Sequence, residues 1–83
     1  GEEFAVIVPG ASLVDTLTFA ERLRAGLQAL RVELPKTVAL TASLGVSAFP
    51  EHGMEPELLL SAADGALYRA KLTGRNRVIP APV

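Results

Sequence analysis

Residues 38–49 form the stretch VALTASLGVSAF, whose side chains alternate strictly between two faces. This period of two predicts one long strand, bent at Gly45, with an apolar face and a face of small and polar residues. Two interpretations of the small polar face remain open: it lines a binding crevice, or it faces solvent or a neighbouring backbone that passes close. We favour the structural interpretation. The apolar face comprises Val38, Leu40, Ala42, Leu44, Val46 and Ala48, and the small polar face comprises Ala39, Thr41, Ser43, Gly45 and Ser47.

The segment before this stretch predicts a strand and then a helix. Phe4–Gly10 is a β-branched apolar run closed by Pro-Gly, which is typical of a buried strand that ends in a turn. Ser12 followed by Asp15 resembles a capping box, and the apolar residues after it recur at spacings typical of an amphipathic helix. We interpret the charged face of this helix as simply solvated. The apolar positions are Leu13, Leu17, Ala20, Leu23, Leu27 and Leu30, and the polar ones are Glu21, Arg22, Arg24, Gln28 and Arg31.

The segment after the central stretch predicts a loop, a helix and a short strand. The helix is expected to begin at Pro56, a favourable first helical residue, and to run to Thr73, with Gly74 as its C-terminal stop. Arg75–Ile79 predicts the last strand, which the following prolines end. The predicted order is therefore strand, helix, strand, helix, strand. The second helix is expected to bury Leu59, Ala63, Ala66 and Ala70.

The composition limits the classes of function. With 83 residues the chain has room for one small domain with a thin margin of stability. Hydrophobic residues make up 49% and the mean hydropathy is +0.35, so we expect exposed apolar surface and a tendency to self-associate. A net charge of −1 without a basic run excludes broad attraction to nucleic acid or anionic lipid. Cysteine is absent, which excludes thiolate metal sites, and His52, the single histidine, is interpreted as a surface residue rather than a ligand.

One polar stripe on the second helix is a candidate anion site. Asp64, Tyr68, Lys71 and Arg75 are spaced by four, three and four residues, which places them on one stripe if the helical turn continues through Gly74. Two interpretations of the basic pair remain open. The two cations complement the dipole at the helix C-terminus, or they bind a polyphosphate.

The opposite end of the chain carries the complementary charge. Glu2 and Glu3 are adjacent carboxylates that precede the apolar run. Carboxylates hold Mg²⁺, and a metal ion together with Lys71 and Arg75 would hold phosphate oxygens. Either half taken alone is a weak signal.

Three segments carry a specific order and spacing of motifs. Residues 1–10 are GEEFAVIVPG, residues 40–53 are LTASLGVSAFPEHG, and residues 62–78 are AADGALYRAKLTGRNRV. The first resembles the GGDEF (GGEEF-type) signature of bacterial diguanylate cyclases without its first glycine, followed by a strand. The second is similar to that family's threonine-serine-glycine strand, and the third to its C-terminal pattern ending in glycine-arginine-asparagine. The resemblance spans essentially the whole chain, and residues 1–83 are expected to correspond to the C-terminal half of a single GGDEF domain.

The resemblance implies an α+β fold and an enzymatic activity. The expected fold is a ferredoxin-like nucleotidyl-cyclase palm with a central, mostly antiparallel sheet flanked by helices. The implied reaction condenses two GTP molecules into cyclic di-GMP and pyrophosphate for bacterial second-messenger signalling. Each subunit of a head-to-head homodimer would present one GTP, and the 3′-hydroxyl of one would attack the α-phosphate of the other. Only the C-terminal half, strand-helix-strand-helix-strand, is expected here, and this half alone is expected to be inactive.

The resemblance also implies roles for five residues. Glu2 would ligate Mg²⁺, with Mn²⁺ as the alternative ion, and Glu3 would support the metal site or the activation of the attacking hydroxyl. Gly1 would lie against the substrate, and Lys71 and Arg75 would hold the terminal phosphates of GTP. Phe4 and the helix leucines would belong to the core. The family's other metal-binding aspartate, its phosphate loop, its guanine-reading residues and its RxxD inhibitory site have no counterpart in these 83 residues.

Two other functions remain open. The first is a degenerate GGDEF module that binds GTP or cyclic di-GMP without turnover, although the intact Gly-Glu-Glu-Phe argues against it. The second is a non-enzymatic ferredoxin-like interaction domain, in which Glu2 is only a turn residue. Besides GTP and a second subunit, the expected partner is a sensory or receiver domain N-terminal to the segment, with no nucleic acid and no membrane contact. The expected location is cytoplasmic, in a parent protein that can itself be membrane-anchored.

Overall fold

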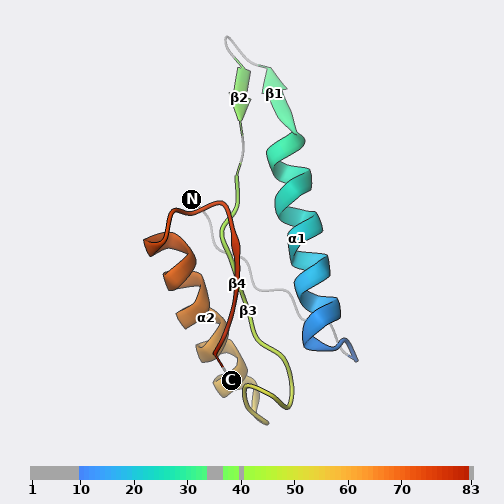
Figure 1. Cartoon of the computed structure of the whole chain (residues 1–83), viewed down its shortest axis with the longest axis vertical. Coiled ribbons are helices and arrows are strands. Elements are labelled where there is room, and N and C mark those ends of the chain that lie inside the picture. The colour runs from blue at the N-terminus through green and yellow to red at the C-terminus, as the bar shows by residue number, and fades with distance from the viewer. Residues whose placement is uncertain (1–9, 34–36, 40, 83) are drawn as a thin grey trace.

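The computed structural model describes residues 10–33, 37–39 and 41–82. Two helices enclose a pair of short strands, and a hairpin extends beyond the end of one helix (Figure 1). This arrangement is α+β, as the sequence predicts. The strand predicted over Phe4–Gly10 lies, except for Gly10, outside the described residues. The elements are α1 (Leu13–Ala29), β1 (Arg31–Glu33), β2 (Thr37–Ala39), β3 (Leu44–Val46), α2 (Pro56–Leu72) and β4 (Val78–Pro80).

Helix α1 begins where its capping signal predicts. The Ser12 hydroxyl accepts a hydrogen bond of 3.1 Å from the Asp15 backbone N–H, which satisfies one of the unpaired donors of the first turn. The helix ends at Ala29, so Arg31 lies in β1 rather than on the predicted helix. The chain then returns, and β1 pairs antiparallel with β2 in a hairpin that the sequence pattern did not predict.

The prediction of one long strand over residues 38–49 is wrong. The segment contains two short strands that pair with different partners: β2 lies antiparallel to β1, and β3 lies parallel to β4, with Gly45 opposite Ile79. Residues 41–43 between them have no regular structure. No single partner strand runs along the whole segment, and the interruption falls before β3 rather than at Gly45.

Helix α2 follows its sequence signals at both ends. Pro56 occupies the first helical position, and the cap residue Thr73 donates its backbone N–H to Arg69 O at 2.9 Å. The last strand, however, starts at Val78 rather than at Arg75. Arg75 and Asn76 have φ angles of 62° and 47°, a left-handed conformation that a β-strand does not accommodate.

The core lies where β3 and β4 pass between the two helices, and its residues are small. Helix α2 lies so close to β3 that a Cβ on Gly45 would be 2.1 Å from Ala63 O. The Ser47 hydroxyl on the same side of the strand donates to Leu59 O at 2.6 Å. At Gly45 and Ser47 the small polar face is therefore a place where a neighbouring backbone passes close, as the structural interpretation predicts for this part of the segment. The buried apolar residues are Ala20, Val46, Ala48, Ala66, Ala70 and Ala81.

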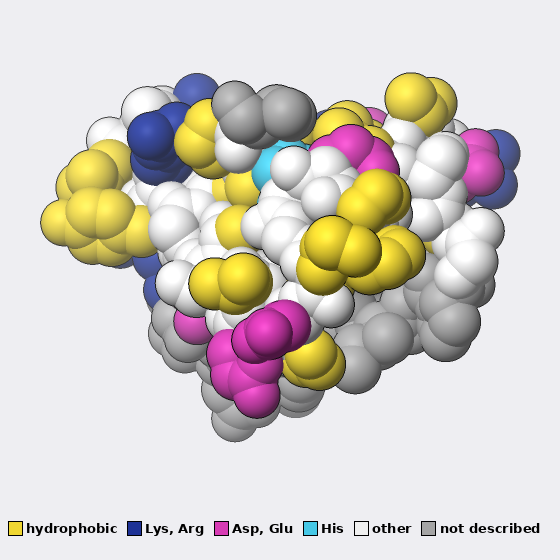
Figure 2. All heavy atoms as spheres, turned by 90° about the horizontal axis from the view of Figure 1, so that it is seen from below, with side chains coloured by type: hydrophobic (Ala, Val, Ile, Leu, Met, Phe, Trp, Pro, Cys, Tyr) yellow, Lys and Arg dark blue, Asp and Glu magenta, His cyan; other side chains and the backbone are white. Residues whose placement is uncertain are grey.

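Many large apolar side chains remain on the surface. The expectation that the helix leucines belong to the core is wrong for Leu23, Leu27 and Leu30, which are 43%, 37% and 52% exposed. The strand pair lies beside α1, and the C-terminal half of the helix runs on towards the hairpin (Figure 1). Figure 2 shows further apolar side chains on the face seen from below. Neither helix of the described ranges is long and apolar enough to span a membrane.

Candidate functional site

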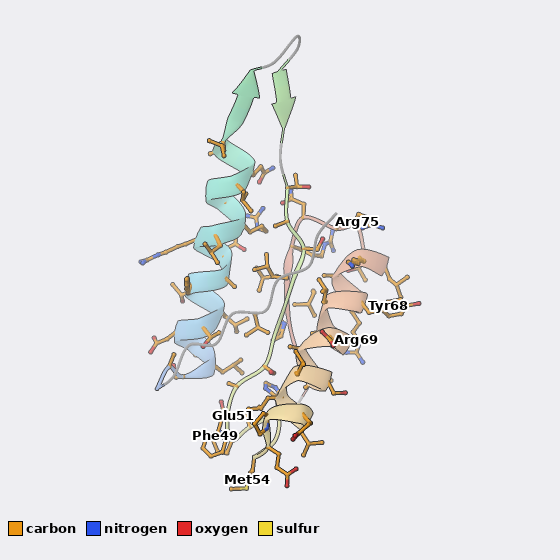
Figure 3. All side chains as sticks on the ribbon, turned by 180° about the vertical axis from the view of Figure 1, so that it is seen from behind. Phe49, Glu51, Met54, Tyr68, Arg69 and Arg75 are labelled. Carbon is orange, nitrogen blue, oxygen red and sulfur yellow. The ribbon has the colours of Figure 1, made fainter. Side chains whose placement is uncertain are left out.

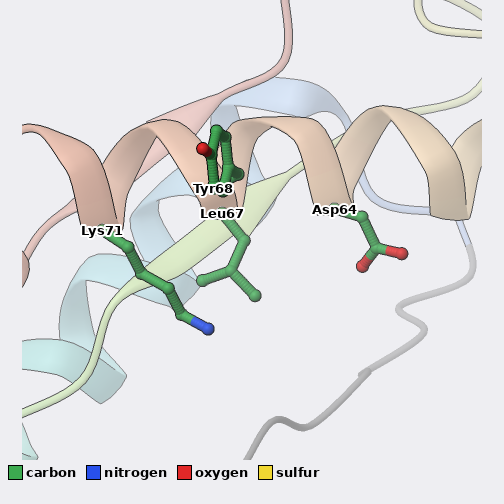
Figure 4. A pocket seen from close by; sticks show the side chains of 4 residues that line it. All are labelled: Asp64, Leu67, Tyr68 and Lys71. Atoms are coloured by element: carbon green, nitrogen blue, oxygen red, sulfur yellow. The ribbon is translucent and has the colours of Figure 1, made fainter.

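A hollow of about 190 Å³ lies along α2. Asp64, Leu67, Tyr68 and Lys71 line it, and the side chains of Asp64, Leu67 and Lys71 point to the same side of the helix (Figure 4). These positions are three or four residues apart, so successive turns bring a carboxylate, a phenol and an ammonium group around one leucine. Three of the four residues of the predicted stripe therefore meet in one place, and Leu67, which the stripe omitted, completes the lining.

Arg75 does not belong to this stripe, and its predicted place there is wrong. The stripe required the helical turn to continue through Gly74, but α2 ends at Leu72 and Gly74 has a φ angle of 128°. The Arg75 N–H donates to Ala70 O at 2.8 Å, the hydrogen bond of a Schellman-type helix end. Its side chain is exposed and lies past the end of α2, whereas Tyr68 projects from the helix itself (Figure 3).

The basic residues at this end of α2 fit both open interpretations. Arg69 and Lys71 lie in the last helical turn, where cations complement the partial negative charge of the free carbonyl groups. Lys71 is half-buried and lines the hollow, whereas Arg69 is exposed and does not. Position alone therefore allows Lys71 to stabilise the helix end and to meet an anion in the hollow.

The turn after α2 is linked to α1 by a contact that the sequence pattern missed. Arg24 Nη1 donates to Asn76 Oδ1 at 3.0 Å, across 52 positions of sequence. The same guanidinium pairs with Glu21, and this hydrogen bond lowers the pKa of the Glu21 carboxyl and raises that of Arg24. The prediction that this charged face is simply solvated is therefore wrong for Arg24. Asn76, placed three residues after the helix cap, was the available signal, because asparagine often adopts positive φ.

His52 is part of the structure rather than a surface residue. It is half-buried, and its ring Nδ1 accepts a hydrogen bond of 2.9 Å from the Ala48 backbone N–H. The backbone N–H of His52 in turn donates to Ala48 O at 2.9 Å. Its Nε2 is buried and has no hydrogen-bond partner in the described part of the chain. These contacts fix the turn between β3 and α2.

The acidic half of the predicted site cannot be placed. Gly1, Glu2 and Glu3 lie outside the described residues, so the roles predicted for them stay predictions. Within residues 10–33, 37–39 and 41–82, no group of three or more histidine, cysteine, aspartate or glutamate side chains is arranged to hold a metal ion.

Comparison with known proteins identifies the family. The sequence model described as "Diguanylate cyclase, GGDEF domain" matches residues 1–77. The chain belongs to this family, so its α+β fold is that of a nucleotidyl-cyclase palm. Members of the family are nucleotidyltransferases that generally use metal ions.

Individual relatives come from several bacteria. The chain is 44% identical to "Response regulator PleD" of Caulobacter vibrioides, over 95% of this chain and 18% of that protein. It is 44% identical to "Diguanylate cyclase VdcA" of Vibrio cholerae, over 96% of this chain and 24% of that protein. It is 40% identical to "Diguanylate cyclase TpbB" of Pseudomonas aeruginosa, over 92% of this chain and 18% of that protein. The chain thus spans about a quarter or less of the length of these relatives.

Proposed function

We propose that the complete domain containing these residues condenses two GTP molecules into cyclic di-GMP and two pyrophosphates. The observation that carries the proposal is the family match over residues 1–77, which includes an intact Gly-Glu-Glu-Phe. In each of two steps a bond forms between a 3′-oxygen and an α-phosphorus, the bond from that phosphorus to pyrophosphate breaks, and the hydroxyl proton is released. We take residues 1–83 as the C-terminal half of that domain.

Lys71 and Arg75 are proposed to hold the β- and γ-phosphates of GTP. Lys71 lines the hollow on α2, and the exposed guanidinium of Arg75 follows within the next turn of chain. A lysine acts on phosphate as a compact charge and an arginine as a planar fork of donors. The pair would neutralise charge on the leaving pyrophosphate, since phosphoryl transfer depends mainly on positioning and charge stabilisation.

Glu2 and Glu3 are proposed to serve the metal site, and Gly1 to let the backbone approach the nucleotide. The donor set consists of adjacent carboxylates in a chain without cysteine, which suits a hard cation, Mg²⁺ or alternatively Mn²⁺. When bound, such an ion supplies neutralisation of phosphate charge. Glu2 would be the ligand, and Glu3 would support the ligand or accept the proton of the attacking hydroxyl.

The proposed assembly is a homodimer, because each half of the product comes from a separate GTP and the two nucleotides must face each other. A sensory or receiver domain N-terminal to these residues would control that encounter. GTP is a cytoplasmic metabolite, so we place the domain in the cytoplasm.

The test is product formation by the complete domain with GTP and Mg²⁺. We expect cyclic di-GMP and pyrophosphate in a 1:2 ratio, and a loss of at least about a hundredfold in turnover for Glu2→Ala, the order of effect of removing an electrostatic group from a phosphoryl-transfer site. Activity that survives Glu2→Ala would remove Glu2 from the metal site, and absence of both product and GTP binding would favour the interaction domain. GTP binding without product would favour the degenerate module.

The role of Arg75 is tested separately by comparing a triphosphate with a monophosphate. The ligands are the 3′-deoxy forms of GTP and GMP, which bind without reacting because the attacking hydroxyl is absent. A charge-assisted contact is worth about 1.5–3 kcal/mol, so Arg75→Ala should weaken the triphosphate about ten- to a hundredfold and spare the monophosphate. The control is Arg69→Ala, because Arg69 is a nearby exposed cation that does not line the hollow. Equal weakening of both ligands would remove Arg75 from the site.

A further inference from the structure

Three consecutive residues after α2 have positive φ angles. Gly74, Arg75 and Asn76 have φ values of 128°, 62° and 47°. Glycine adopts such angles freely and asparagine tolerates them, but arginine does so only when its surroundings hold it there. The conformation that presents Arg75 therefore depends on contacts made by its neighbours.

Those contacts hold the turn from two sides. The Arg75 N–H bonds to the last turn of α2, as described above. The Asn76 N–H donates to the Ser43 hydroxyl at 3.1 Å, next to β3. The Asn76 side chain accepts from Arg24 Nη1, which belongs to α1. Asn76 is thus the point where α1 and the β3 segment both hold the chain that carries Arg75.

The guanidinium of Arg24 is oriented before it reaches Asn76. Its Nε donates to both carboxylate oxygens of Glu21, at 3.1 and 3.0 Å, and Nη1 also donates to Gln28 Oε1 at 3.0 Å. Its side chain is only 17% exposed, although it belongs to a face of polar residues. A planar guanidinium held along one edge by a carboxylate directs its remaining donors in fixed directions. Arg24 is therefore built to hold Asn76 Oδ1 in one position.

We propose that Arg24 is a positioning residue for triphosphate binding: through Asn76 it holds the turn in which Arg75 is presented to the terminal phosphates. This inference rests on the proposed phosphate-binding role of Arg75. Without the Arg24 contact the Asn76 side chain loses its link to α1, and the turn samples other backbone conformations. The triphosphate then pays an ordering cost that a monophosphate, which does not reach Arg75, avoids.

The test measures selectivity between the 3′-deoxy forms of GTP and GMP by calorimetry on the complete domain. Arg24→Ala removes the donor, and Asn76→Gly removes the acceptor while keeping a residue that accepts positive φ. Each should weaken the triphosphate roughly three- to tenfold, the effect of one hydrogen bond, and leave the monophosphate unchanged. Gln28→Ala, which removes the other acceptor of Nη1, is the matched control and should change neither affinity.

The outcomes of this experiment distinguish failure of the positioning role of Arg24 from failure of the proposed phosphate-binding role of Arg75. Combining Arg24→Ala with Arg75→Ala should lower selectivity no further than Arg75→Ala alone, a result that a purely structural role of Arg24 would not produce. Unchanged selectivity in both Arg24→Ala and Asn76→Gly, with Arg75→Ala still impaired, overturns the positioning role alone. Unchanged selectivity in Arg75→Ala overturns the phosphate assignment and the positioning role together. Thermal unfolding of each variant shows whether the protein is folded. If the Arg24→Ala variant does not fold, the affinities of the Asn76→Gly variant decide the test.

Discussion

Replacing Gly45 by alanine is expected to destabilise the domain strongly, because the added methyl group has no space. Its Cβ would lie 2.1 Å from Ala63 O, 2.3 Å from Leu67 N and 2.9 Å from Leu67 Cα. Favourable contacts between carbon atoms occur at about 3.5–4.0 Å. All three clashing atoms belong to the backbone of α2, so no side-chain rotation relieves them. The helix must move away from β3 by more than about 1 Å to restore ordinary contact distances.

The cost follows from what that movement separates. Ala66 and Ala70 of α2 are 1% and 0% exposed, so they have no spare room, and a shift of the helix opens the small-residue core. Overpacking a close-packed interior costs about 1–3 kcal/mol and occasionally more. We expect about 3 kcal/mol or more for Gly45→Ala, against a total of about 5–15 kcal/mol for a typical domain. Because α2 carries Lys71, triphosphate affinity should fall along with stability.

Urea unfolding of the complete domain measures this effect, and α2 offers a matched control. Gly65→Ala adds the same methyl group to the helix at a position with nothing within 4 Å of the new Cβ. It should raise stability by about 0.5–1 kcal/mol, because alanine is the better helix former. A Gly45→Ala variant within about 0.5 kcal/mol of the wild type, the usual range of neutral surface changes, would refute the close packing of α2 on β3.

Three further changes test local features of the chain. Ser12→Ala removes the α1 cap and should cost about 1 kcal/mol in thermal unfolding, whereas Ser12→Asp should cost little; equal loss in both would contradict the cap. Gly74→Ala forces a methyl-bearing residue into a φ of 128° and should cost about 1–3 kcal/mol; an unchanged melting temperature would argue against that conformation. The lowered pKa of Glu21 means that its pairing with Arg24 stabilises the fold at neutral pH and is lost as the pH falls through that pKa. Melting temperatures of wild type and Glu21→Gln should therefore differ at neutral pH and converge in acid; a difference independent of pH would exclude the carboxylate as its cause.

The helices could be predicted because their signals are local. Ser12 caps α1, Pro56 opens α2 and Gly74 ends it, and each acts through atoms within about four residues. The hairpin of β1 and β2 gave no comparable signal. Strand β1 is three residues long, too short for a period of two to show itself, and β2 lies largely within the alternating stretch that was predicted as one strand.

The division of residues 38–49 into two strands was hidden for a different reason. Side-chain alternation is the same in a continuous strand and in two consecutive strands, since it reports the backbone and not the partner. Partner choice depends on β1, which immediately precedes the segment, and on β4, which follows it only after the whole of α2. The same limit explains why the exposure of Leu23 and Leu27 was not predicted. Periodicity shows that the two leucines share one side of α1, but the extent of the strand pair decides how much of that side is covered.

The stripe on α2 was predictable as far as the helix extends and not beyond it. Lys71 was placed correctly on α2 because helical spacing carries as far as the helix does. Arg75 was placed wrongly because the same spacing was extended beyond Gly74, where three positive φ angles redirect the chain. Glycine followed within two residues by asparagine marks such a turn, and a turn of this kind needs partners for its polar groups. A charged residue on a neighbouring helix is then better interpreted as a candidate partner than as part of a solvated face, and Arg24 fills that role for Asn76.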